Sequence, residues 1–272
     1  MKKYLFGVIV FTVTCNLSIM AFSQQKTFKP YDNKIIAHRG AWKKNGLPEN
    51  SIASLKQAIA QKYAGSEFDV HLTADDSLVI NHDDVFQGLT IATTTYNELT
   101  QHTLSNGEKI PTLREYISTG MQNNEGTLLI TEIKPCPNDP ERALRCAEKS
   151  LQLIKQLGAA SRVVYISFDY AVLQKIKSLD ASAPTQFLDG TKTPEALHKD
   201  HIEGADYHYS VFKKNPDWIA DARKHNIILN AWTVNNSTDM DWLLSNNFDY
   251  ITTNEPELLA ERIEQYKAVN KK

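Results

Sequence analysis

The segment Ser66-Glu67-Phe68-Asp69-Val70-His71-Leu72 alternates polar and apolar side chains along its whole length. Successive side chains of a β-strand point to opposite faces, so Glu67 and Asp69 share one face and the apolar side chains share the other. In a barrel, the apolar face packs against the surrounding helices and the carboxylates point toward the barrel axis. The segment therefore predicts a β-strand with an acidic inner face.

The rest of the chain repeats the order strand, then helix. Strands are expected at residues 34–38, 66–72, 127–133, 163–167, 185–188, 205–209, 227–232 and 250–253, and helices at residues 52–62, 112–123, 140–157, 170–179, 194–200, 216–225, 238–245 and 256–266. This alternation is typical of parallel strands joined by crossover helices. Eight such units close naturally into a barrel, whereas an open doubly wound sheet more often has about five or six strands. The sequence therefore predicts an α/β fold, a (β/α)8 TIM barrel.

Residues 81–109 form one long irregular stretch, rich in Thr, Asn and Gly. We expect a small loop or lid insertion after the second strand, because irregular stretches of this length in compact folds usually serve function. Residues 78–81 would extend that strand as a hairpin arm. No internal repeat, low-complexity tract or linker divides the chain, so we expect a single domain at residues 24–272.

The N-terminus has the pattern of a signal peptide at residues 1–23, with Lys2-Lys3, an apolar stretch and a small-residue cleavage site. We expect cleavage after Ser23, export to the periplasm or medium, and no stable membrane insertion afterwards. An uncleaved N-terminal anchor is an alternative. Lipidation at Cys15 is disfavoured, because Thr12-Val13-Thr14 lacks the Leu and small residues expected before a lipidated cysteine.

The composition limits the partners of the protein. With 30 basic and 32 acidic residues, the net charge of -2 gives no sequence-wide reason to bind nucleic acid or an anionic membrane. An anionic ligand must therefore be held by a local cluster. Cys136 and Cys146 remain after loss of the leader, and two unpaired thiols are favoured over a disulfide, which needs Cα atoms within about 7 Å. The sequence leaves the oligomeric state open.

Acidic and basic residues follow the predicted strands at their carboxyl ends, where barrel enzymes place their active sites. Glu67, Asp69 and Glu132 would converge there and repel one another unless a cation lay between them. Oxygen ligands suit a hard divalent cation, so we expect one Mg²⁺ or Ca²⁺. Arg39 and Lys134 lie beside these acids and would bind a phosphate. The alternative interpretation is that the acids only form salt bridges with Arg39 and Lys134.

Two histidines complete the candidate site. His38 ends the first strand and His82 begins the insertion, and imidazole can accept and donate a proton near neutral pH. His71 shares the face of Glu67 and Asp69 but is left without a role. The same holds for the other histidines, which have no comparable context: His102, His198, His201, His208 and His225.

These segments together resemble the glycerophosphodiester phosphodiesterase family. The resemblance lies in His38-Arg39-Gly40, Pro48-Glu49-Asn50-Ser51, Glu67-Phe68-Asp69-Val70 with Thr73 and Asp75, His82-Asp83, Ile110-Pro111-Thr112-Leu113, Glu132-Ile133-Lys134, Ser167-Phe168-Asp169, Trp232-Thr233-Val234-Asn235 and Thr252-Thr253-Asn254-Glu255-Pro256. It covers essentially the whole chain after the leader, and motifs in this order and spacing are specific.

The resemblance implies hydrolysis of a glycerophosphodiester to glycerol 3-phosphate and an alcohol. It also implies a divalent cation at Glu67, Asp69 and Glu132, with His38 and His82 as general acid and base. The glycerol hydroxyl next to the phosphate would attack phosphorus and give a cyclic phosphate that water opens.

Three further positions follow from the same resemblance. Glu49 would support the metal or Arg39, and its being a ligand is left open. Trp232 would pack on the glycerol or cap the barrel. Asn254 stands where the family usually has Asp, and the change would matter little if this position only caps the last helix.

Two other functions remain as alternatives. One is a similar barrel that cleaves lysophospholipids or sphingolipids in the manner of a phospholipase D, although no membrane-anchoring aromatic patch is visible. The other is a non-catalytic binding protein, which predicts damage at catalytic positions, and none of the positions named above shows it.

Overall fold

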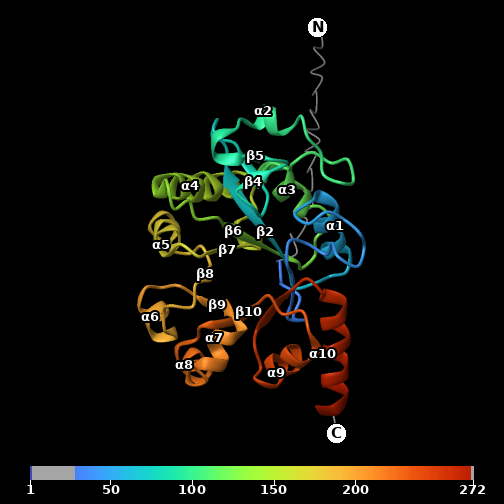
Figure 1. Cartoon of the computed structure of the whole chain (residues 1–272), viewed down its shortest axis with the longest axis vertical. Coiled ribbons are helices and arrows are strands. Elements are labelled where there is room, and N and C mark those ends of the chain that lie inside the picture. The colour runs from blue at the N-terminus through green and yellow to red at the C-terminus, as the bar shows by residue number, and fades with distance from the viewer. Residues whose placement is uncertain (2–27, 271–272) are drawn as a thin grey trace.

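The chain folds into a closed barrel of eight parallel strands (Figure 1). The computed structural model describes Met1 and residues 28–270, so the predicted signal peptide, with Cys15 and the Ser23 cleavage site, lies outside the described residues. The strands are β1 (Ile35–Ala37), β2 (Gly65–Leu72), β6 (Leu128–Ile133), β7 (Val163–Ser167), β8 (Thr185–Phe187), β9 (Gly204–His208), β10 (Ile228–Trp232) and β11 (Tyr250–Thr253). Pairing of β1 with both β2 and β11 closes the barrel, which confirms the predicted (β/α)8 fold.

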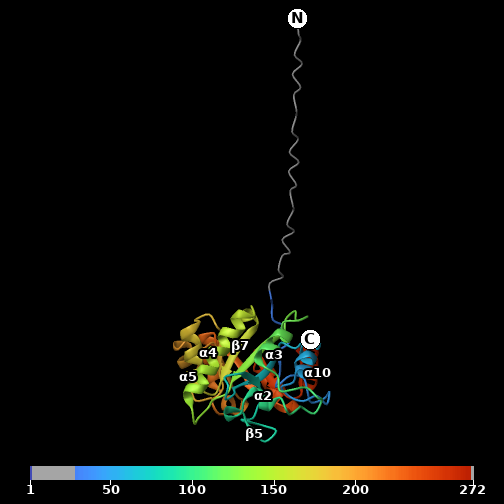
Figure 2. The same ribbon diagram turned by 90° about the horizontal axis from the view of Figure 1, so that it is seen from above.

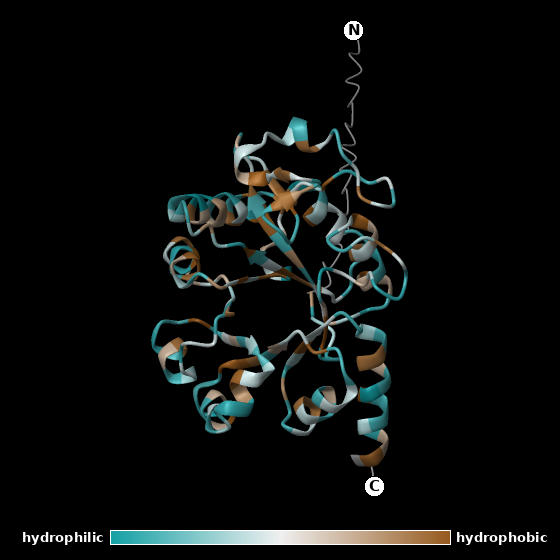
Figure 3. Cartoon of the chain, viewed as in Figure 1, coloured by the Kyte–Doolittle hydropathy of each residue, from teal (hydrophilic) through white to brown (hydrophobic). Residues whose placement is uncertain are grey.

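The predicted helices are all present, with ends shifted by a few residues. They are α1 (Ile52–Ala60), α3 (Leu113–Gly120), α4 (Pro140–Gln156), α5 (Tyr170–Leu179), α6 (Pro194–Lys199), α8 (Asp217–His225), α9 (Ser237–Ser245) and α10 (Pro256–Asn270). None of the described helices is long and apolar enough to cross a membrane. Their hydrophobic and hydrophilic residues alternate along each ribbon, as expected of helices with one face against a barrel (Figure 3).

A further helix, α7 (Tyr209–Lys214), was not predicted. The sequence prediction extended the sixth barrel strand to Tyr209, but the strand ends at His208. There the His208 ring accepts a hydrogen bond from the backbone N–H of Ser210, 3.3 Å away, and caps α7. Histidine is not one of the usual capping residues, so this helix start had no clear sequence signal.

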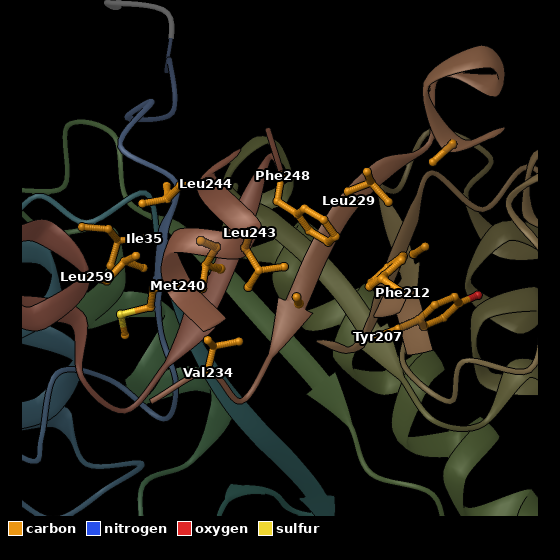
Figure 4. Packing of buried hydrophobic residues seen from close by; sticks show 14 of the residues in the cluster. Ile35, Tyr207, Phe212, Leu229, Val234, Met240, Leu243, Leu244, Phe248 and Leu259 are labelled. Atoms are coloured by element: carbon orange, nitrogen blue, oxygen red, sulfur yellow. The ribbon is translucent and has the colours of Figure 1, made fainter. Parts of the chain in front are cut away.

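Most of the apolar core lies between the barrel strands and the helices. Figure 4 shows one part of it, a cluster that includes Leu229 of β10, Phe212 of α7 and Leu243 of α9. A smaller set, which includes Ile36, Ile130 and Ile166, is also buried. The strands thus form a rigid frame that fixes the side chains at their ends.

The insertion after β2 is a packed unit rather than an irregular loop. It contains β3 (Leu78–Ile80), which pairs antiparallel with β2 as predicted, the hairpin β4 (Val85–Phe86) and β5 (Leu89–Thr90), a 3₁₀ turn (Ile91–Thr93) and α2 (Tyr96–Leu99). It has its own buried cluster: Val79, Phe86, Ile91, Leu99 and Ile110. In Figure 2, α2 and β5 lie along one edge of the molecule.

The two cysteines in the described chain are free thiols. Cys136 is half-buried in the segment after β6, and Cys146 is buried on α4. This agrees with the favoured sequence interpretation of two unpaired thiols.

Candidate active site

Three acidic side chains meet inside the barrel. Asp69 on β2 lies directly opposite Glu132 on β6 in the parallel register, and Glu67 lies two residues before Asp69 on the same face. One carboxylate oxygen from each of the three lies within 4.8 Å of the others. The exposed fractions of Glu67, Asp69 and Glu132 are 2%, 0% and 7%, so the structure brings the predicted ligand set together in a buried position.

The turn after β1 holds Glu67 through the backbone. Arg39 has a positive φ of 58°, and its N–H donates to Glu67 Oε2 at 2.8 Å. Gly40 follows with φ 84°, and a Cβ at this position would lie 2.4 Å from Ser54 Oγ. Only glycine fits both the backbone angle and this close approach.

The other two acids have partners of different kinds. Asn50 Nδ2 donates to Asp69 Oδ2 at 2.8 Å, so Asn50 positions an acid of the site. Lys134 Nζ lies 3.3 Å from Asp69 Oδ1 and 2.8 Å from Glu132 Oε1. The salt bridges of the alternative interpretation therefore exist at Lys134, while Glu67 Oε1 is buried and has no hydrogen-bond partner among the residues that the structure describes.

The raised pKa values of two of the three acids indicate that negative charge is in excess in this cluster. Burial and the neighbouring Asp69 raise the pKa of Glu67 well above its usual value, and the same two causes raise the pKa of Glu132 to about 7. Burial alone would also raise the pKa of Asp69, but Lys134 and other positive neighbours hold it below its usual value. A hard divalent cation among three carboxylates fits both this excess and the unpartnered oxygen of Glu67.

Arg39 and Glu49 form a pair at the edge of the site. Arg39 Nη1 donates to both carboxylate oxygens of Glu49, at 2.9 and 3.0 Å, and Arg39 Nε lies 3.9 Å from Asp69 Oδ2. Glu49 is not among the acids that cluster around the candidate metal position. Of the two supporting roles open for Glu49, this geometry favours orientation of Arg39.

The two candidate catalytic histidines have different partners. His38 Nδ1 lies 2.7 Å from the side-chain oxygen of Asn254, and its Nε2 lies 3.9 Å from Glu67 Oε2. Burial, and to a lesser degree Arg39, lowers the pKa of His38 to about 4. His82 places its Nδ1 2.6 Å from the carboxylate of Asp83 and is about one third exposed. The His38 imidazole thus has a neutral amide as its partner, and the His82 imidazole has a carboxylate.

Both histidines line one small cavity with Glu67 and Glu132. It has a volume of about 110 Å³. Its lining residues are His38, Arg39, Glu67, His82, Glu132, Lys134, Ile166, Phe168, Leu188, Asp206, Trp232, Thr233 and Thr252. Trp232 lines it while packing edge-on against Phe168, with ring centroids 5.3 Å apart, and donating from Nε1 to the Asp206 carbonyl at 2.7 Å. Its ring therefore both faces the cavity and closes the barrel wall.

Sequence reasoning missed one residue of this site and the role of another. Asn254 contacts His38, so its identity bears on the histidine directly. Asp206 of β9 is buried in the cavity wall, and its Oδ1 has no hydrogen-bond partner within residues 28–270. Burial, followed by the nearby Glu132, raises the pKa of Asp206 well above its usual value. An acid in the middle of a predicted buried strand was the available signal for Asp206.

His71 lies in contact with the insertion. Its Nε2 is 3.3 Å from the carbonyl oxygen of His82, and the side chain is largely buried. It therefore supports the segment that carries His82. Among the other unassigned histidines, His208 caps α7 and packs near Trp232, with ring centroids 5.4 Å apart.

Comparison with known proteins gives consistent results. The model of the glycerophosphoryl diester phosphodiesterase family matches residues 38–258. A glycerophosphodiester phosphodiesterase from Caldanaerobacter subterraneus is 28% identical over 242 residues, which cover 84% of this chain and 97% of the relative.

Solved structures agree with the family match. A glycerophosphodiester phosphodiesterase from Parabacteroides distasonis has a TM-score of 0.83 at 38% identity, covering 88% of this chain and 99% of its own. A phosphodiesterase from Oleispira antarctica, solved with the product sn-glycerol-3-phosphate, has a TM-score of 0.72 at 25% identity, covering 85% and 96%.

Proposed function

Because the chain belongs to the glycerophosphoryl diester phosphodiesterase family, we propose that it hydrolyses glycerophosphodiesters to glycerol 3-phosphate and an alcohol with the help of one divalent cation, Mg²⁺ or Ca²⁺. The observation that carries the proposal is the buried cluster of Glu67, Asp69 and Glu132, beside two histidines in one cavity. Product binding by the Oleispira antarctica relative supports glycerol 3-phosphate as the product here.

Glu67, Asp69 and Glu132 would hold the cation. When bound, it would offset charge on the phosphate and orient the attacking hydroxyl. Arg39 and Lys134 line the same cavity and would bind the phosphate oxygens, with Arg39 held in place by Glu49. Trp232 and Phe168 form the apolar side of the cavity, where the carbon chain of the glycerol would pack.

The partners of the two histidines suggest which is the base. The side-chain oxygen of Asn254 can only accept a hydrogen bond, so His38 carries its proton on Nδ1 and presents the lone pair of Nε2 toward the cavity. His38 Nε2 would take the proton of the glycerol hydroxyl as that oxygen bonds to phosphorus. Asp83 offsets the charge of His82 as an imidazolium, so His82 would give a proton to the departing alcohol oxygen. Water would then open the cyclic phosphate with the two roles exchanged.

The test is release of glycerol 3-phosphate from glycerophosphocholine, with and without EDTA. We expect activity that EDTA removes and that Mg²⁺ or Ca²⁺ restores, and a loss of about 10² to 10⁴-fold in His38→Ala. His102→Ala, which changes an exposed histidine of the insertion, is the matched control. Activity that is indifferent to EDTA would contradict the metal assignment.

The same assay separates the alternatives. Faster turnover of lysophospholipids or sphingomyelin than of glycerophosphocholine would favour a lipid-cleaving enzyme. Binding of glycerophosphocholine without turnover of any of these substrates would favour a binding protein.

Export and removal of residues 1–23 are part of the proposal and rest on the sequence pattern alone. We expect the protein in the periplasmic or secreted fraction, beginning at Gln24. Mass spectrometry of the purified natural protein measures its N-terminus, and a chain beginning at Met1 would contradict cleavage.

A further inference from the structure

A second cavity lies beside the catalytic one, with a volume of about 370 Å³. Its walls come from the insertion, the segment after β6 and the first turns of α4, and they include Asp84, Ala92, Pro135 and Ala143. Lys134 lines both cavities. The two spaces therefore meet at a residue that is proposed to bind the phosphate.

We propose that this second cavity is the subsite for the alcohol half of the substrate, and that it selects a short alcohol with a primary ammonium group. The inference rests on the proposed function and adds to it the identity of the leaving group. The second cavity is called the head-group cavity below.

The sizes of the two cavities support this division. The catalytic cavity has a volume of about 110 Å³, below the range of about 300 to 1,000 Å³ that is typical for sites that enclose a whole small ligand. A glycerophosphodiester with its phosphate at Lys134 would fill the catalytic cavity with its glycerol and must place its alcohol elsewhere. The head-group cavity is within the usual range and begins at the same lysine.

The position of His82 supports the same assignment of the head-group cavity. His82 would donate a proton to the departing oxygen, so the alcohol must leave on the side of the insertion that carries it. The carbonyl of His82 contacts His71, and His71 lines the head-group cavity. The proton donor and the head-group cavity thus lie on the same side of the phosphate.

The charges in the head-group cavity favour a cation. Its two cationic side chains have partners of their own, because Lys134 lies against Asp69, Glu132 and the proposed phosphate position, and Arg142 donates to two backbone carbonyls and pairs with Asp139. Among the described residues, the carboxylate of Asp84 has only His71 as an ion-pair partner, with Nδ1 3.8 Å away. Asp84 is therefore the carboxylate that is free to accept hydrogen bonds from an ammonium group.

The remaining walls set the size and type of that cation. Leu72, Pro135 and Ala143 are apolar and would pack against the carbon atoms of a short chain. In the described part of the chain, no aromatic side chain other than the His71 imidazole lines the head-group cavity, whereas quaternary ammonium groups are usually held in cages of aromatic rings. A primary ammonium on two or three carbons fits these walls better than a trimethylammonium group does.

The test compares three substrates that share the glycerol phosphate and differ in the alcohol: methanol, ethanol and ethanolamine. Ratios of kcat/KM are compared between enzymes, because the intrinsic reactivity of each substrate then cancels. The Asp84 side chain is 78% exposed, so for Asp84→Asn we expect the ratio of the ethanolamine to the ethanol substrate to fall by about two- to five-fold, as for loss of an exposed ion pair. For Ala92→Phe, which fills the head-group cavity, we expect the ratio of the ethanol to the methanol substrate to fall by about two- to four-fold, the effect of one buried methylene.

Glu125→Gln is the matched control for Asp84→Asn. It removes an exposed carboxylate from the loop before β6, at the opposite end of the barrel, and should leave both ratios unchanged. Hydrolysis of all three substrates with unchanged ratios in both cavity variants would overturn the head-group subsite alone. If the wild-type enzyme released glycerol 3-phosphate from none of them, the proposed function would fail and the subsite with it.

Discussion

The hydrogen bond between Asn254 and His38 gives the sharpest test of the active site. Asn254→Ala removes the acceptor 2.7 Å from His38 Nδ1 and leaves the ring free to turn or to move its proton to Nε2. A hydrogen bond of this kind contributes about 0.5 to 1.5 kcal/mol, which corresponds to about 2- to 12-fold in rate. We expect a fall of that size in kcat with little change in KM, because the contact acts on His38, the proposed base, and not on substrate binding.

Asn254→Asp provides the second half of the test. It keeps an acceptor at the same place, so kcat should stay well above that of the alanine variant. The added negative charge favours protonated His38, whose pKa is about 4 in the wild type, and the base works only when neutral. The acidic limb of the kcat/KM profile should therefore move to higher pH in Asn254→Asp.

The assay is glycerol 3-phosphate release between pH 4 and 9 in the presence of the activating cation. Asn97→Ala, an exposed asparagine of α2, is the matched control. Equal kcat values for the wild type and Asn254→Ala would refute the positioning role. An acidic limb at the same pH in the wild type and Asn254→Asp would refute the electrostatic reasoning.

Three further predictions concern stability and binding. Because the pKa of Glu132 is raised to about 7, the metal-free folded state binds more protons than the unfolded state between about pH 4.5 and 7. The melting temperature in thermal unfolding should therefore fall as pH rises through this window. A saturating divalent cation should raise the melting temperature more at pH 8 than at pH 5. Glu49→Gln should raise KM several-fold with a smaller change in kcat, since it weakens the hold on Arg39, and steady-state kinetics would contradict this if kcat alone fell. Gly40→Ala should lower the free energy of unfolding by about 2 kcal/mol or more, because its φ is 84° and the new Cβ would meet Ser54 at 2.4 Å; an unchanged denaturant midpoint would speak against this strain.

The fold was predictable because its determinants are local and repeated. Alternation in residues 66–72 identified the inner and outer faces of β2, and the acids of that strand do lie inside the barrel. The sequence predicted where the insertion lies, but not that it is a packed unit with its own hydrophobic cluster. Its apolar residues, such as Phe86 and Leu99, are spaced too irregularly to indicate a core of their own, yet they pack together.

The site was predictable where residues sit at strand ends and was missed where contacts join segments far apart in the sequence. Glu132 follows from its place at the end of a strand. Asn254 meets His38 over a separation of 216 residues, and only closure of β11 against β1 brings them together. Asp206 was missed because strand periodicity alone does not tell whether a buried acid reaches a cavity or a structural partner.

Because the insertion has its own hydrophobic cluster, the two candidate catalytic histidines are held by different parts of the enzyme, the barrel and the insertion. His38 and the acids depend on the barrel, whereas His82 depends on the packing of Phe86, Leu99 and their neighbours. Substitutions in that small cluster would thus affect the proton donation proposed for His82 while leaving the position of His38 unchanged. In a survey of variants at these positions, the turnover rate would fall more than the protein abundance. Positions with this difference would mark the boundary between the insertion and the barrel.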